Sequence, residues 1–125
     1  MQKDYLSWNQ FSDCVAKLIV LIKKDNLKYD GVYGIPRGGL PLAVTMSHAL
    51  GLPLLAHPTE NTLVVDDISD TGNALNGIKR KKIACIYTTP WTITKPDYFI
   101  LTKESKDHWI IFPWEGENEG NQQTA

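Results

Sequence analysis

The sequence has few cysteines, no long hydrophobic run and almost no net charge, and each of these excludes a class of protein. Of its 125 residues only Cys14 and Cys85 are cysteines, both in apolar segments without CxxC spacing. We therefore expect buried, reduced thiols and no disulfide framework. The longest apolar run, Leu18 to Ile22, is too short to span a bilayer. A formal net charge of -1 provides no general attraction to nucleic acid, so we expect a cytoplasmic protein with neither membrane nor nucleic-acid partners.

Several common catalytic signatures are also missing. No Gly-Lys-Ser/Thr of a Walker A loop occurs, and no GxGxxG fingerprint of a dinucleotide site. The histidines lack the spacing of zinc ligands, and no Gly-x-Ser-x-Gly nucleophile elbow is present. P-loop, dinucleotide-dependent, zinc and serine-hydrolase chemistries are therefore not indicated.

The composition is that of one globular domain. Apolar residues make up 42% and charged residues 22% of the chain, close to the average for folded proteins. We expect the domain to occupy residues 1–115, because residues 116–125 are polar, lack periodicity and are predicted to be disordered. Strand-like and helix-like segments alternate, which predicts an α/β fold: a mostly parallel sheet with flanking helices.

The expected elements follow from hydrophobic spacing and turn residues. Ser7 and Gln10 form a capping-box pattern, and apolar residues at helical spacing then predict a helix of about 18 residues. A second helix is expected over 40–50, ended by Gly51. Tyr5 and Leu6 form a short strand or an extended lead-in. Short apolar runs predict further strands over 31–36, 53–56, 62–65, 82–87 and 98–101.

Two adjacent carboxylates follow the run Thr62–Val65. We expect Asp66 and Asp67 at the carboxyl end of a buried parallel strand, the edge where open α/β sheets bind ligands. The turn 70–73 then opens a short predicted helix, whose backbone N–H groups and dipole suit a phosphate. This pattern predicts a phosphorylated sugar, bound together with a divalent cation.

A second glycine-rich turn lies between an expected strand and an expected helix. Gly38 and Gly39 allow backbone amides to approach an anion, and Arg37 adds a fork of donors. Two anion sites and two acids on one sheet edge suit a ligand with separated phosphate groups and a sugar diol.

These stretches resemble the type I phosphoribosyltransferase family. Residues Leu63 to Gly72 resemble its PRPP signature, and Arg37-Gly38-Gly39 resembles its pyrophosphate loop. The segments Leu6–Trp8 and Trp109–Glu115 are similar to the two ends of the xanthine-guanine (hypoxanthine) branch. The resemblance covers residues 5–115 and implies the type I phosphoribosyltransferase fold. It also implies conversion of a purine-like base to its nucleoside 5′-monophosphate, using PRPP and Mg²⁺ and releasing pyrophosphate.

The resemblance also implies a role for each matching position. Asp66 and Asp67 would hold the ribose hydroxyls and, directly or through water, Mg²⁺, while Asp70 would be the catalytic acid/base at the purine N7 atom. The resemblance further implies a cis peptide bond between Pro36 and Arg37. The other implied contacts are Asp70, Thr71, Gly72, Asn73 and Ala74 for the 5′-phosphate, Arg37, Gly38 and Gly39 for the pyrophosphate, and Thr89, Trp109, Ile110 and Glu115 for the base.

Three positions depart from the family pattern. Thr89 stands where the branch has a lysine that meets the purine O6 atom, and Ala74 stands where a second hydroxyl residue is common. The long hood loop that covers PRPP in the family is reduced to residues 57–61. A non-catalytic module that binds PRPP or a nucleotide for regulation is the alternative function. Trp91 and Trp114 are interpreted as packing or dimer residues, and the resemblance allows a homodimer.

Overall fold

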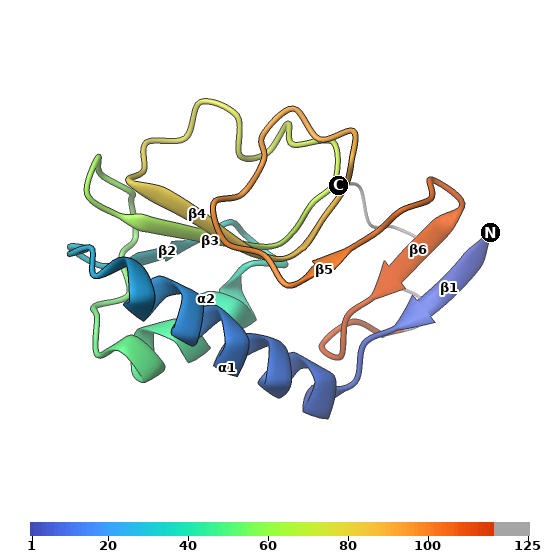
Figure 1. Ribbon diagram of the computed structural model, residues 1–125, viewed down its shortest axis with the longest axis horizontal. Helices are drawn as coiled ribbons and strands as arrows, with labels where there is room; N and C mark the ends of the chain where they lie inside the picture. The colour runs from blue at the N-terminus through green and yellow to red at the C-terminus, as the bar shows by residue number, and fades with distance from the viewer. Residues whose placement is uncertain (117–125) are drawn as a thin grey trace.

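The computed structural model of the chain describes residues 1–116 and shows a parallel sheet with two helices beneath it (Figure 1). The four-stranded sheet has the order β2-β3-β4-β5, with every neighbouring pair parallel. A separate parallel pair, β1 and β6, stands beside it. This confirms the predicted α/β class. The elements are β1 (Gln2–Tyr5), α1 (Trp8–Asp25), β2 (Val32–Gly34), α2 (Leu40–Leu50), β3 (Leu63–Ser69), β4 (Lys82–Thr88), β5 (Leu101–Thr102) and β6 (His108–Ile111).

Helix α1 has the start and length that its sequence predicts. The Gln10 backbone N–H donates to Ser7 Oγ at 3.1 Å, and Gln10 Oε1 accepts from the Ser7 N–H at 2.8 Å. This reciprocal capping box satisfies two of the N–H groups that a helix start leaves without partners. The helix ends at Asn26, which takes the left-handed conformation that terminates many helices.

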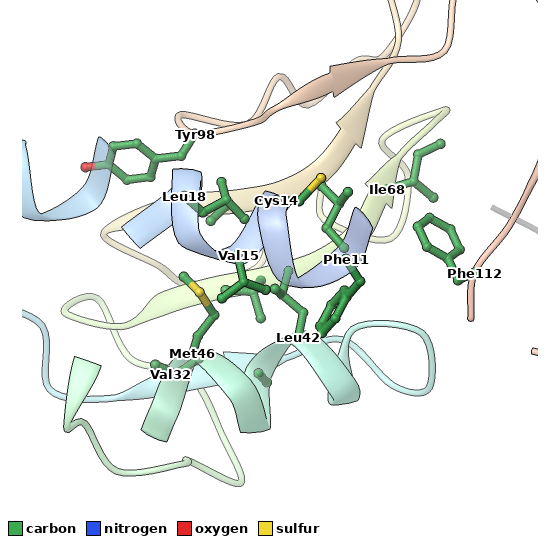
Figure 2. Packing of buried hydrophobic residues seen from close by; sticks show 14 of the residues in the cluster. Phe11, Cys14, Val15, Leu18, Val32, Leu42, Met46, Ile68, Tyr98 and Phe112 are labelled. Carbon is green, nitrogen blue, oxygen red and sulfur yellow. The ribbon is translucent and has the colours of Figure 1, made fainter. Parts of the chain in front are cut away.

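Both helices bury their apolar stripes against the same face of the large sheet. Helix α1 contributes Phe11, Val15 and Leu18, and α2 contributes Leu42 and Met46, to one continuous core (Figure 2). Burial of this apolar surface holds the two helices on the sheet. None of the helices among residues 1–116 is long and apolar enough to cross a membrane.

Strand β3 is the interior element of the molecule. It pairs with β2 on one side and β4 on the other, and all seven of its residues are buried. In a parallel sheet the carboxyl ends of neighbouring strands meet at one edge. The segments that leave β2, β3 and β4 therefore begin close together.

The small sheet joins the start of the described chain to its end. Strand β1 pairs with β6 in register, Gln2 opposite His108 and Tyr5 opposite Ile111. Just beyond, Phe112 and Trp114 stack with ring centroids 5.2 Å apart, and Trp114 packs edge-on against Phe11 at 5.3 Å. The packing role predicted for Trp114 is thus confirmed, whereas the pairing of β1 with β6 has no counterpart in the predicted elements.

One predicted helix is absent, and two predicted strands are shorter than expected. No helix follows the 70–73 turn; residues 73–77 form successive turns. The Asn76 N–H makes one helix-like bond to the Gly72 carbonyl, and Gly77, with a positive φ of 79°, ends the turns before a helix can form. The predicted strand 53–56 is reduced to one bridge between Leu54 and Val32. Of the strand predicted over 98–101, Tyr98 forms one parallel bridge with Ala84 of β4, and the regular strand, β5, is Leu101–Thr102. Before it, the Asp97 carboxylate accepts from the Ile83 N–H.

The shortened hood segment, residues 57–61, lies at the amino-terminal edge of the sheet. The Asp30 carboxylate, which precedes β2, accepts hydrogen bonds from the hydroxyls of Thr59 and Thr62, and Asp30 N–H donates to Asn61 O at 3.0 Å. These bonds anchor the segment next to the starts of β2 and β3. It therefore lies at the opposite edge from the carboxyl strand ends, where the acids and glycine turns were predicted to act. The tail predicted to be disordered lies, beyond Gly116, outside the described residues.

The capping box provides a direct test of this fold. Ser7→Ala should lower the free energy of unfolding by about 1 kcal/mol, because the Gln10 N–H loses its acceptor. Urea unfolding measures the change. Ser12→Ala, an exposed position inside α1, is the matched control and should stay within about 0.5 kcal/mol of the original protein. Equal effects of the two substitutions would contradict the capping role.

Candidate active site

The two adjacent carboxylates lie inside β3 (Leu63–Ser69), whereas the prediction placed them at the carboxyl end of the strand. Asp66 is 7% exposed and Asp67 5% exposed, and Asp66 pairs with Cys85 of β4. The Asp67 N–H donates to Asp66 Oδ1 at 2.9 Å, and the Ile68 N–H donates to Asp67 Oδ1 at 2.8 Å. The strand is longer than its apolar run: it continues through both acids and ends at Ser69.

Burial raises the pKa of both carboxyl groups. The pKa of Asp66 lies well above its usual range, first because of lost hydration and second because the charge of Asp67 is adjacent. Lost hydration also raises the pKa of Asp67, although hydrogen bonds partly offset the shift. Two neighbouring buried carboxylates disfavour each other's charge. A cation bound beside the pair would therefore reduce the repulsion between the two carboxylates.

The donor set fits Mg²⁺ shared with a substrate better than a metal held by protein alone. Among residues 1–116 no group of three or more His, Cys, Asp or Glu side chains could hold a metal ion. Mg²⁺ commonly takes one or two carboxylates and completes its octahedron with substrate oxygens and waters. Asp66 and Asp67 are the two residues that could supply those carboxylates.

The Arg37 turn lies directly against Asp67 of this acid pair. A methyl group added at Gly38 would collide with Asp67 Oδ2, so the glycine permits the close approach. The peptide bond between Pro36 and Arg37 is cis, as the resemblance implied. The Gly39 N–H donates to the Ile35 carbonyl at 2.8 Å. Of the three residues predicted to bind pyrophosphate, Gly39 thus has its amide committed, and the side chain of Arg37 is exposed.

The turn after β3 presents its amides outward even though no helix follows it. Three successive carbonyls, those of residues 70–72, accept hydrogen bonds from the Thr89 hydroxyl at 2.6 Å, the Ile93 N–H at 2.9 Å and the Thr94 hydroxyl at 2.7 Å. In a trans peptide the N–H points opposite to the C=O. The N–H groups of residues 71–73 therefore point away from the segment after β4, and the Asn73 N–H donates to Thr71 Oγ1 at 3.2 Å. Successive N–H groups turned to one side suit an anion.

Asp70 lies beside a buried lysine that the sequence prediction missed. Lys103, directly after β5, places Nζ 2.7 Å from Asp70 Oδ2, with side chains 7% and 13% exposed respectively. The Trp91 indole N–H donates to Asp70 Oδ1 at 2.9 Å. The Lys103 ammonium also lies 5.9 Å from the ring centroids of both Trp91 and Trp109. Trp91, predicted to be a packing or dimer residue, thus contacts the predicted catalytic carboxylate.

The four residues predicted to bind the base have different surroundings. Trp109 lies beside Lys103, and its half-buried side chain has an indole N–H without a partner among the described residues. Thr89 is 4% exposed and its hydroxyl is committed to the Asp70 carbonyl. Ile110 is buried within β6, opposite Asp4 of β1. The Glu115 carboxylate accepts from the Phe112 N–H at 2.8 Å, which closes the turn after β6.

Known proteins are similar to this chain in sequence and in fold. No family model matches the sequence. Xanthine-guanine phosphoribosyltransferase of Desulfotalea psychrophila is 28% identical to the chain over 91% of this chain and 87% of its own. The crystal structure of a purine phosphoribosyltransferase from Pyrococcus horikoshii is 33% identical, with a TM-score of 0.79 over 93% of this chain and 96% of its own. The Helicobacter pylori xanthine-guanine-hypoxanthine enzyme, at 21% identity and a TM-score of 0.78 over 97% and 99% of the chains, shares the fold.

The shared fold, with an acid pair and two glycine turns at one sheet edge, defines a phosphoribosyltransferase. With 33% identity to one such protein over nearly all of both chains, the chain belongs to the type I phosphoribosyltransferase family. Its similarity to enzymes of the xanthine-guanine branch covers about nine tenths of its length.

The buried acid pair should make the protein less stable as the pH rises. The folded-state pKa values lie above the unfolded value of about 3.9. Above that pH the folded state retains protons that the unfolded state has lost, so the free energy of unfolding falls as the pH rises through the folded-state pKa. Asp66→Asn removes one of these charges and should stabilise the protein by about 1–3 kcal/mol at pH 8 without divalent cations, and by less at pH 5.

Urea unfolding at both pH values measures this difference. Asp13→Asn, at an exposed position of α1, is the control and should change stability by less than about 0.5 kcal/mol at either pH. An Asp66→Asn protein that is less stable than the original at pH 8, or whose gain is equal at pH 5, would contradict the electrostatic account.

Proposed function

We propose that the chain transfers the 5-phosphoribosyl group of PRPP to a purine base, with release of pyrophosphate and in the presence of Mg²⁺. One observation carries the proposal: the buried carboxylates Asp66 and Asp67 lie between two turns that suit anions. The Arg37 turn touches Asp67, and the 70–73 turn follows β3 directly. PRPP has this pattern of groups, a ribose diol between a 5′-phosphate and a 1′-pyrophosphate. The names of the relatives support a purine as acceptor.

Different side chains and backbone amides would bind different parts of the substrate. Asp66 and Asp67 would accept hydrogen bonds from the ribose hydroxyls and hold Mg²⁺ directly or through water. The N–H groups of residues 71 and 72 would donate to the 5′-phosphate, joined by the Thr71 hydroxyl and, once its bond to Thr71 Oγ1 opens, by the Asn73 N–H. The Arg37 guanidinium and the Gly38 amide would bind the pyrophosphate, and a guanidinium can bind phosphate oxygens through two parallel bonds. When bound, Mg²⁺ would supply positive charge at the departing pyrophosphate.

The reaction forms one bond and breaks one at C1′. The C1′–O bond to pyrophosphate breaks and a ring nitrogen of the purine bonds to C1′. In the transition state, while both bonds are weak, the sugar has oxocarbenium character. The purine gives up one proton. Asp70 would take it at N7; its carboxylate contacts Trp91 and Lys103, and Lys103 lies beside Trp109, where the base would bind. Fixed donors and acceptors around the developing charge lower the barrier without reorganisation.

A non-catalytic module that binds PRPP or a nucleotide is the second candidate function. The observation that favours it is the position of residues 57–61 at the amino-terminal edge. Within residues 1–116 the segment that leads into β3 does not cover the carboxyl edge, and a covering loop would exclude water from the reaction. Both candidate functions predict that the protein binds PRPP, but only the enzyme function predicts that it releases pyrophosphate from PRPP.

Pyrophosphate release in the presence of PRPP, Mg²⁺ and a panel of purines separates the two. The protein should turn over at least one purine, and Asp70→Asn should lower kcat by about 10²–10⁴-fold, because it loses the group that takes the proton. Asp107→Asn, an exposed carboxylate before β6, is the matched control and should keep the original rate. Saturable PRPP binding without release of pyrophosphate on the whole panel would establish the binding module instead.

A further inference from the structure

Thr94, in the segment between β4 and β5, is a buried threonine whose hydroxyl is bonded to the main chain of the 70–73 turn. Its side chain is 6% exposed, and its Oγ1 donates to the Gly72 carbonyl at 2.7 Å. A hydroxyl buried to this extent needs a hydrogen-bond partner. That partner is a carbonyl 22 positions earlier in the sequence, so the bond joins two segments that are distant along the chain.

The 92–94 segment packs directly against the turn at Gly72. Gly72 has a positive φ of 84°, and a methyl group added there would collide with the Thr92 hydroxyl and the Thr94 backbone nitrogen. Glycine suits both this conformation and this close approach. It also leaves the backbone with more freedom than other residues do, so a hydrogen bond from outside the turn is needed to hold its peptide group in one orientation.

Further hydrogen bonds hold Thr94 itself in place. The Ser69 hydroxyl donates to the Thr94 carbonyl at 2.7 Å and lies 2.9 Å from the Thr92 hydroxyl. The Thr94 N–H donates to Thr92 Oγ1 at 3.2 Å. Ser69 is the last residue of β3 and is 1% exposed. The network therefore fixes Thr94 relative to the strand that carries the two acids.

The Thr94 bond turns the next N–H of the turn outward. The Gly72 carbonyl points to Thr94, so the Asn73 N–H of the same trans peptide points the opposite way. That N–H donates to Oγ1 of the exposed Thr71 at 3.2 Å. The Gly72 carbonyl accepts a second bond, from the Asn76 N–H at 3.1 Å, as its two lone pairs permit. Thr94 thus supplies the side-chain donor that orients this peptide.

We propose that Thr94 is a positioning residue for the 5′-phosphate, because its hydroxyl holds the Gly72–Asn73 peptide with the Asn73 N–H facing the bound phosphate. A phosphate oxygen would replace Thr71 Oγ1 as the acceptor, and an N–H bond to a charged oxygen is stronger than one to a neutral hydroxyl. A donor that is fixed before the ligand arrives does not have to be ordered on binding. This inference rests on the proposed function only in assigning the 70–73 turn to a 5′-phosphate.

A structural role is the competing explanation, because the same bonds also fix the 92–94 segment. Loss of a buried hydrogen bond lowers stability in either case, so unfolding measurements alone do not distinguish the two roles. Two ligands do. Ribose 5-phosphate would use the 70–73 turn, and pyrophosphate with Mg²⁺ would use the Arg37 turn. A positioning role changes the affinity for the first ligand alone, whereas a purely structural role changes both affinities or neither.

Calorimetry with ribose 5-phosphate, and separately with pyrophosphate and Mg²⁺, provides the test. Thr94→Val removes the hydroxyl at nearly constant shape. It should lower the affinity for ribose 5-phosphate by about 10-fold, as one charge-assisted hydrogen bond implies, and keep the affinity for pyrophosphate. Thr94→Ser retains a hydroxyl and should recover most of the lost affinity. Thr45→Val removes a 2.8 Å hydroxyl-to-carbonyl bond inside α2 and, as the matched control, should leave both affinities unchanged.

Three results would overturn the proposal. The first is equal affinity for ribose 5-phosphate in Thr94→Val and the original protein. The second is an equal loss of affinity for both ligands in Thr94→Val. The third is an original protein that does not bind ribose 5-phosphate, which would also remove the assignment of the turn.

A second variant keeps the test valid if Thr94→Val does not fold. Ser69→Ala retains the Thr94 hydroxyl but removes the bond that holds the Thr94 carbonyl. It should lower the affinity for ribose 5-phosphate by about 2–10-fold and keep that for pyrophosphate; a folded Ser69→Ala protein with the original affinity would contradict the proposal.

Failure of the proposed function has another signature. A protein that shows the Thr94 effect on ribose 5-phosphate but transfers no base retains the inference and loses the activity. A protein that transfers a base, and whose Thr94→Val variant has the original KM for PRPP, retains the activity and loses the inference.

Discussion

Burial of the Asp66 and Asp67 carboxylates in β3 is the constraint on which the rest of the site depends. A strand that pairs on both sides and is buried at all seven residues normally has apolar side chains throughout. Placing two carboxylates there costs free energy, and their raised pKa values express that cost. Apolar packing on both faces of β3 offsets this cost. A bound cation would supply positive charge beside the carboxylates, and the hydroxyls of a bound sugar diol would donate hydrogen bonds to them.

The surroundings of the acids are arranged by contacts between distant parts of the chain. The Arg37 turn reaches Asp67 because residue 38 has no side chain. The 70–73 turn is held by hydroxyl and amide donors of residues 89–94, which turn its own amides outward. Lys103 meets Asp70 across 33 residues of sequence. Contacts with distant segments, and not local turn preference alone, thus hold the two turns beside the acids.

Much of the fold and part of the site could be predicted from local patterns. The capping box at Ser7 and the apolar stripe of α1 are local signals, and the structure confirms them. The helix expected after Asp70 is wrong because bonds from Thr89, Ile93 and Thr94 determine that backbone, and these residues lie about 20 positions further on. The strand containing Asp66 was predicted too short, because carboxylates usually mark a strand's end. Lys103 was missed because it stands in a polar run, Thr102 to Asp107, that resembles a solvated loop.

Binding of PRPP to the acid pair is the central claim, and calorimetry tests it most directly. PRPP titrated into the protein with Mg²⁺ should give saturable binding at one site per chain. In the Asp66→Asn, Asp67→Asn protein the affinity should fall by at least about 10²-fold, because charge-assisted bonds contribute about 1.5–3 kcal/mol each. Unfolding measurements show whether this protein is folded. Equal affinity for PRPP and Mg²⁺ in the folded variant and the original protein would contradict the claim.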